Sequence, residues 1–205
     1  MEQRSADWYA ARLGNVTASR VADIMATTKT GAPAASRRNY LCQLLCERLT
    51  GLAAEPFESE AMRHGTETEP LARSEYEMRN GVLVRECGLV MHPSIPGFGA
   101  SPDGLVGNDG LLEIKCPNTA THIETLRSGT PAAGYLYQMY SQMACTGRQW
   151  CDFVSYDDRL PDYAAYFQTR IDCNESAIAE ISAAVTSFLH ELEVAIAQIV
   201  GRKAA

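Results

Sequence analysis

The chain has 205 residues, 46% of them hydrophobic and 21% charged, and a formal net charge of −7 at pH 7. This length and composition predict one globular domain over residues 1–205, with a full hydrophobic core. Neither the roughly 18 consecutive apolar residues of a membrane span nor a secretory signal pattern is found, so we expect a cytoplasmic protein with no membrane partner.

Charge is unevenly distributed along the chain. Residues 1–50 carry a net charge of +3, whereas residues 51–105 and residues 106–205 each carry −5. The overall acidity argues against a protein that coats nucleic acid non-specifically. An acidic metal site facing a basic N-terminal segment that binds phosphates would produce this pattern, as would a random distribution of surface charge.

The seven cysteines form an odd set without compact spacing, which predicts reduced, mostly buried thiols rather than disulfides. Cys42 and Cys46 lie one helical turn apart. Because no second pair or nearby histidine completes a zinc site, we interpret this pair as core packing.

The N-terminal segment predicts a short helix around residues 8–13, a break at Gly14 and a second helix that begins near Thr17. A helix N-terminus beside hydroxyl groups and Arg12 is a natural anion site, suited to the phosphate of a DNA end. Simple helix capping by Thr17 is the alternative and the simpler interpretation.

Further helices are predicted over residues 37–50 and 67–79, joined by a polar link at 52–60, with Pro70 in the first turn of the second helix. In that second helix, Glu69 is the carboxylate expected to face the metal hairpin described below. From Val82 the apolar period changes to that of short strands in a meander. These strands comprise VLVREC, GLVMH, GFGASPDG and LLEIKCP.

The stretch SPDGLVGNDGLLEIKCP, residues 101–117, carries the chemistry. Its Asp-Gly and Asn-Asp-Gly sequences favour tight reversals, which fold Asp103 back toward Glu113 in a hairpin. Strand alternation places Glu113 and Lys115 on one face and Ile114 on the other. Two carboxylates and one ammonium can hold a divalent metal beside a phosphate, although a solvated surface pair would have the same sequence.

Beyond the hairpin, residues 118–129 and 131–146 predict helices, and Gln138 and Gln142 share a face of the second one. QWCDFVSYD and YAAYFQTRID predict two more strands. Residues 174–200 predict a long amphipathic C-terminal helix, capped by Asn174.

Four blocks in order, WYAARLGNVTAS, HGTETEPLAR, SPDG to LEIKCP, and YLYQMYSQM, resemble the lambda exonuclease and YqaJ-like alkaline exonuclease family of PD-(D/E)xK nucleases. The resemblance implies an α/β fold with a restriction-endonuclease-like central mixed β-sheet flanked by helices. It also implies a homotrimer ring that threads duplex DNA. The implied activity is Mg²⁺-dependent 5′→3′ digestion of one strand of linear double-stranded DNA to 5′-mononucleotides. The remaining 3′ overhang passes to a single-strand annealing protein during phage recombination in a bacterial host cell.

The same resemblance assigns site residues. It implies two Mg²⁺ ions, replaceable by Mn²⁺, and a lysine that orients or deprotonates the attacking water. Beside two metal ions in a partly buried cleft, we expect the pKa of that lysine to fall. The metal ligands it implies are Asp103, Glu113, Glu69 and the Ile114 carbonyl; the lysine is Lys115, and Gln138 steadies the site. The residues it implies at the DNA end are Arg12, Ser19, Ser101 and Thr17 around the 5′-phosphate, with Met62 as the strand-separating wedge.

One position departs from the family pattern. Thr121 stands where lambda exonuclease has a phosphate-binding arginine, so we expect a weaker preference for 5′-phosphorylated ends or another cation such as Arg127. Three alternatives remain open: a structure-selective or restriction-like endonuclease on the same core, a catalytically silent DNA-end-binding module, and an iron–sulfur nuclease of the RecB type. The last is disfavoured because Cys145, Cys151 and Cys173 lack clustered spacing.

Overall fold

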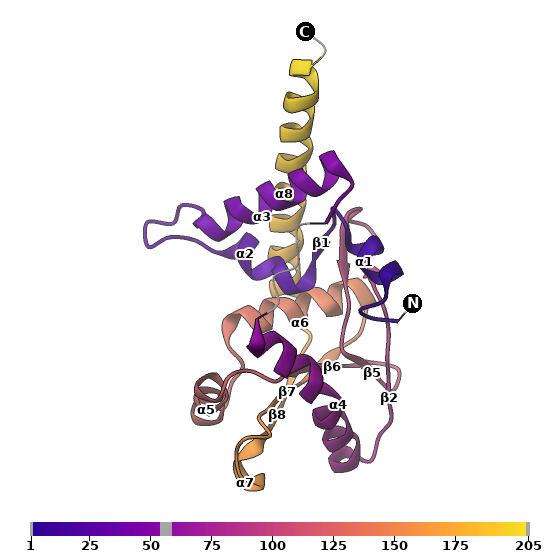
Figure 1. Cartoon of the computed structure of the whole chain (residues 1–205), viewed down its shortest axis with the longest axis vertical. Coiled ribbons are helices and arrows are strands. Elements are labelled where there is room, and N and C mark those ends of the chain that lie inside the picture. The colour runs from indigo at the N-terminus through magenta and orange to yellow at the C-terminus, as the bar shows by residue number, and fades with distance from the viewer. Residues whose placement is uncertain (1, 54–58, 204–205) are drawn as a thin grey trace.

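The computed structural model describes residues 2–53 and 59–203, so most of the predicted link at 52–60 lies outside the described residues. Helices and two sheets form a mixed α/β fold with a long C-terminal helix, as predicted (Figure 1). The helices are α1 (Ala6–Arg12), α2 (Val21–Met25), α3 (Ala35–Thr50), α4 (Glu60–Asn80), α5 (Thr119–Ser128), α6 (Ala133–Thr146), α7 (Asp162–Ala165) and α8 (Glu175–Lys203).

The larger sheet has the strand order β2-β5-β6-β7-β8. Its strands are β2 (Val84–Arg85), β5 (Gly104–Val106), β6 (Gly110–Lys115), β7 (Trp150–Tyr156) and β8 (Tyr166–Asp172). The central pair β6–β7 is parallel and its other neighbours are antiparallel, so the sheet is mixed, as expected.

A second sheet of three strands has the order β1-β4-β3. Its strands are β1 (Val16–Thr17), β3 (Val90–Met91) and β4 (Phe98–Ala100), and β1 runs parallel to β4. The prediction of one meander from Val82 onward was therefore wrong. The strands exist, but β4 pairs with the distant N-terminal segment, and the chain changes sheets at residues 101–103.

Helices cover both faces of the larger sheet. On one face Tyr76 of α4 packs against Leu112 and Ile114 of β6. On the other face Met139 of α6 packs with Leu111, also from β6. Because side chains alternate along a strand, every second residue of β6 faces α6, and this is the face that the site uses.

Helix α8 extends beyond the rest of the molecule in Figure 1. Its first half is held by Ile181, Val185, Phe188 and Leu192, which are buried in a core shared with α2, α3 and α6. By length and composition alone α8 would be long enough and apolar enough to cross a membrane, and 22% of that apolar stretch is buried, in the stripe that packs against the core. The prediction of a long helix capped by Asn174, whose side chain accepts from the Ala177 amide, is confirmed.

Two helix predictions were wrong at their starts. Helix α4 begins at Glu60, where the Ser59 hydroxyl caps it, so Pro70 lies mid-helix and not in the first turn. Pro70 is exposed, so water can reach the carbonyl group left without its amide partner. Thr17 makes no side-chain cap, because it lies in β1 and is followed by a 3₁₀ turn before α2.

The cysteines are free thiols, as predicted, but they are less buried than expected. Only Cys145 and Cys151 are buried, whereas Cys42 and Cys46 are exposed. The core interpretation of the Cys42–Cys46 pair was wrong because α3 turns a different face, with Tyr40 and Leu44, toward the interior.

Candidate active site

The β5–β6 hairpin brings two carboxylates together, as the turn chemistry predicted. Gly104 pairs with Leu112, and this register places Asp103 beside the next residues of β6. The Ile114 amide donates a hydrogen bond of 2.7 Å to Asp103 Oδ2. The reversal uses Gly107 in the left-handed region at φ = 52°, where a side chain would be strained.

Glu113 is fully buried and is held from three directions. Gln138 Nε2 donates to its Oε1 over 2.6 Å, and Gln142 Nε2 donates to Oε2. The Lys115 ammonium forms an ion pair with Oε1. The predicted common direction of Glu113 and Lys115 is therefore confirmed, and Gln142 is a site residue that the assignment of Gln138 alone missed. Its i, i+4 spacing from Gln138 on α6 was the available signal.

The ionisable groups of this cluster perturb one another. Burial and then the charge of Glu113 raise the pKa of Asp103 well above its usual range. Burial acts to lower the pKa of Lys115, but the charges of Glu113 and Asp103 outweigh it and raise that pKa. The protein's own charges thus keep Lys115 an ammonium, and the predicted fall in its pKa depends on the positive charge of metal ions.

Glu69 lies at the edge of the same cluster. Its charge helps to raise the pKa of Asp103, and its side chain forms ion pairs with Arg4 at 2.5 Å and with Arg73 at 2.9 Å. The carboxylate that α4 contributes is therefore near the hairpin, as expected. Arg4 and Arg73 are partners that the sequence did not predict.

The donor set fits a hard divalent cation. Asp103, Glu113 and Glu69 offer carboxylate oxygens, and the Ile114 backbone lies against Asp103. Oxygen ligands select Mg²⁺ or Mn²⁺ over softer metals. Since burial and mutual repulsion already disfavour the second negative charge, a dication placed among these carboxylates would stabilise their ionised forms.

A cavity of about 890 Å³ is lined by residues of the N-terminal segment, α3 and α4, and none of Asp103, Glu113 and Lys115 is among them. Among its lining residues are three of the predicted phosphate ligands, Arg12, Thr17 and Ser19, and also Met62. Arg4, which also lines the cavity, connects it to the cluster through its ion pair with Glu69.

Ser101 reaches this cavity indirectly. Its hydroxyl accepts a hydrogen bond of 2.9 Å from Trp8 Nε1, and the Arg12 guanidinium lies 4.1 Å from the centre of the Trp8 ring. Trp8 thus joins two of the predicted phosphate ligands, and its role was missed because an aromatic residue in a short helix carries no specific signal.

Arg127, which was suggested to replace the phosphate-binding arginine missing at Thr121, lies away from the cavity. Arg127 is exposed, pairs with Glu124 and does not line the cavity, whereas Arg4 and Arg20 do. Met62 is 56% exposed at the cavity, a position compatible with the wedge that was predicted there.

Comparison with known proteins shows the family of this chain. The model of the YqaJ-like viral recombinase domain matches residues 7–149. The chain belongs to this family. No curated protein matches it. The alkaline exonuclease LHK-Exo from Laribacter hongkongensis is 58% identical, with 98% of each chain covered and a TM-score of 0.89; its complex with dAMP gives 0.90 at the same identity and coverage.

A more distant structure shares the fold alone. The phage-related exonuclease from Haemophilus somnus 129PT is 16% identical, with a TM-score of 0.72 over 90% of this chain and 96% of that one. Family membership and the alkaline exonuclease relative together support a nuclease role for this member of the YqaJ-like family.

Proposed function

We propose that this YqaJ-like protein is a Mg²⁺-dependent exonuclease that digests one strand of linear double-stranded DNA from its 5′ end and leaves a 3′ overhang. The observation that carries the proposal is the convergence of Asp103, Glu113 and Lys115, with Arg4 joining neighbouring Glu69 to a cavity that Arg12 also lines. A relative of 58% identity is an alkaline exonuclease captured with dAMP, a mononucleotide of the kind that such digestion releases.

The residues divide the chemistry between them. Asp103, Glu113, Glu69 and the Ile114 carbonyl would hold two Mg²⁺ ions; when bound, such ions would lower the pKa of a water molecule and stabilise negative charge on the leaving 3′-oxygen. Gln138 and Gln142 fix the carboxylate of Glu113 through both of its oxygens. Lys115 orients the water and stabilises negative charge at the phosphate.

The cavity would set the direction of digestion, from the 5′ end toward the 3′ end. Arg12, Thr17 and Ser19 line it, with Ser101 joined through Trp8, so a terminal 5′-phosphate meets guanidinium and hydroxyl donors. A strand whose 5′ end is anchored there presents its first phosphodiester to the carboxylate cluster. Met62 would then lie between the anchored base and its former partner.

We further propose a single catalytic domain over residues 1–205, assembled as a homotrimer ring around the duplex. The 3′ overhang would pass to a single-strand annealing protein in the cytoplasm of a bacterial host. Analytical ultracentrifugation tests the trimer, because a monomer at assay concentrations contradicts it.

The central test is digestion of linear duplex labelled separately at its 5′ and 3′ ends, with Mg²⁺. We expect release of the 5′ label first, and loss of activity by a factor of about 10² or more in Asp103→Ala and Lys115→Ala. Arg127→Ala, at an exposed ion pair outside the site, is the matched control and should remain active. Unchanged digestion by either site variant contradicts the assignment, and cutting of covalently closed circles indicates an endonuclease.

A second test addresses the DNA end. Arg12→Ala should lower the rate on 5′-phosphorylated ends more than on 5′-hydroxyl ends, because only the former bring the charge that the guanidinium pairs with. Equal losses on both ends would remove the phosphate-binding role of Arg12.

A further inference from the structure

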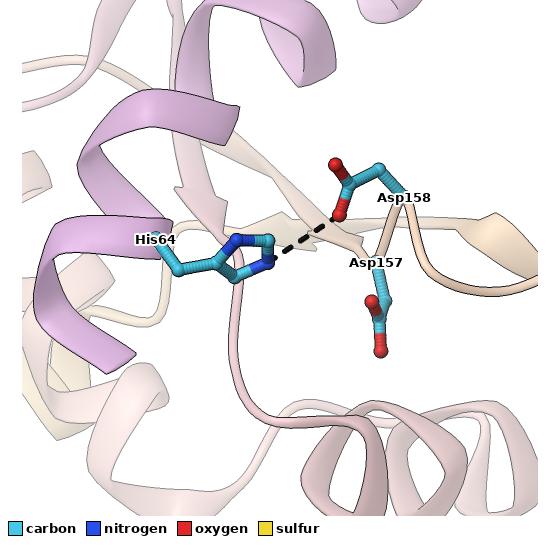
Figure 2. A group of neighbouring side chains, drawn as sticks. All are labelled: His64, Asp157 and Asp158. Carbon is cyan, nitrogen blue, oxygen red and sulfur yellow. Dashed lines mark ion pairs between the residues drawn. The ribbon is translucent and has the colours of Figure 1, made fainter. Parts of the chain in front are cut away.

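A second group of metal-ligating side chains lies outside the proposed catalytic cluster. His64 of α4 points toward Asp158, which follows β7, and Asp157 lies next to it in the chain (Figure 2). One ligand atom from each residue lies within 4.8 Å of the other two. His64 Nε2 and Asp158 Oδ1 are 3.3 Å apart, without the alignment of a hydrogen bond.

Two buried atoms of this group have no hydrogen-bond partner among the residues that the structure describes. They are His64 Nε2 and Asp157 Oδ2, the latter on a side chain that is fully buried. Leaving such atoms unpaired costs about 1–3 kcal/mol each, more for a charged group. Buried nitrogen and carboxylate oxygen atoms left unpaired together indicate a ligand that would bind both.

The other atoms of the group are already oriented. The Thr68 hydroxyl lies 3.4 Å from His64 Nδ1, the position from which a second residue usually fixes a metal-binding imidazole. The Arg159 side chain and amide donate to Asp157 Oδ1 and leave Oδ2 free. His64 Nε2 and Asp157 Oδ2 are therefore the atoms available to an ion.

We propose that His64, Asp157 and Asp158 form a second metal site, which takes a divalent transition metal of the Zn²⁺ class rather than Mg²⁺. An imidazole ligand favours such metals, whereas Mg²⁺ prefers oxygen atoms alone. Ligands about 2.0–2.1 Å from a tetrahedral ion lie about 3.3 Å from each other, which is the His64–Asp158 separation.

A metal ion at this site would link α4 to the end of β7 in the larger sheet. Helix α4 contacts the chain just beyond β6: a Cβ atom on Gly65 would lie 3.4 Å, a van der Waals contact, from the carbonyl oxygen of Cys116, one residue after Lys115. An ion held by His64 and the two aspartates joins the helix that carries Glu69 to the end of β7, the parallel neighbour of β6. Its role is thus positional, and it does not rest on the proposed exonuclease activity.

The test is binding of Co²⁺ and Zn²⁺ to the full chain in excess Mg²⁺, which occupies oxygen-only sites. We expect one Co²⁺ per chain with a visible absorption band of mixed nitrogen and oxygen ligands, displaced by Zn²⁺. Affinity should fall by at least about tenfold in His64→Ala and Asp158→Asn, and by about 10-fold to 100-fold in Thr68→Val, which removes only the supporting hydroxyl.

Matched controls separate this site from the catalytic cluster. His190→Ala, at an exposed histidine on α8, and Asp103→Asn should both retain the Co²⁺ band. No Co²⁺ bound in excess Mg²⁺, equal affinity in wild type and His64→Ala, or loss of the band in Asp103→Asn would each overturn the proposal. The first result would mean that His64 and Asp158 form an ion pair only. The readout is binding and not digestion, so it is independent of the exonuclease proposal.

Discussion

Replacing Lys115 by methionine removes the ammonium that forms an ion pair with the buried Glu113 carboxylate. The Lys115 side chain is 24% exposed, Glu113 is fully buried, and Asp103, whose pKa burial and Glu113 raise, lies in the same cluster. In metal-free buffer at neutral pH, Lys115→Met should therefore lower the free energy of unfolding, because it leaves buried negative charge uncompensated.

The magnitude follows from burial. Breaking a buried ion pair by removing one partner costs about 3–5 kcal/mol, and the partial exposure of Lys115 favours the lower end, about 3 kcal/mol. That is more than a hundredfold in the unfolding equilibrium. The matched control is Arg127→Met, which removes an exposed ion pair with Glu124 and should cost less than about 1 kcal/mol.

Urea denaturation of both variants, with and without Mg²⁺, measures the difference. Mg²⁺ should stabilise Lys115→Met more than it stabilises wild type, because the cation replaces the missing positive charge. The double variant Glu113→Gln/Lys115→Met should regain part of the lost stability. If Lys115→Met costs no more than Arg127→Met without Mg²⁺, the ammonium does not compensate the buried carboxylates, and the electrostatic account of the site is wrong.

Three further predictions concern the scaffold. Gln142→Leu should lower Mn²⁺ affinity by about 10-fold to 100-fold in a Mn²⁺ titration, because the buried glutamate loses the donor that orients it. Burial acts to raise the pKa of Asp157, but the hydrogen bonds and the charge of Arg159 lower it. Arg159→Ala should therefore lower the free energy of unfolding above about pH 4. This difference from wild type should disappear as the pH falls through the lowered folded-state pKa of Asp157, which urea titrations at several pH values measure. Gly110→Ala should cost about 1–3 kcal/mol of unfolding free energy, because its Cβ would lie 2.1 Å from the Trp150 ring.

Each of these has a contradicting result. Unchanged Mn²⁺ affinity in Gln142→Leu would mean that Gln138 alone orients the carboxylate. A stability difference for Arg159→Ala that persists at low pH would assign its effect to packing. If Gly110→Ala has the stability of wild type, and adding Trp150→Leu to it gives no further stability, then the Trp150 ring moves aside without cost and the predicted clash is wrong.

The sequence by itself determined the hairpin and the identity of its charged groups. The turn residues around Gly107, followed by alternating apolar residues, bring Asp103 to the Ile114 amide, and strand alternation puts Glu113 and Lys115 on one face. These contacts are local, so residue type and spacing along ten positions are enough to predict them. The long helix α8 could be predicted for the same reason, because its apolar residues recur every three or four positions along the chain.

The tertiary structure decided what surrounds that hairpin. Gln142 becomes a site residue only because α6 packs on one face of β6, and Arg4 becomes a partner of Glu69 only because the fold brings the N-terminal segment within ion-pair distance of α4. His64 meets Asp158 because α4 packs against the end of β7. Pairings between residues 25 to 94 positions apart depend on how whole elements pack, and no short-range pattern in the chain encodes that packing.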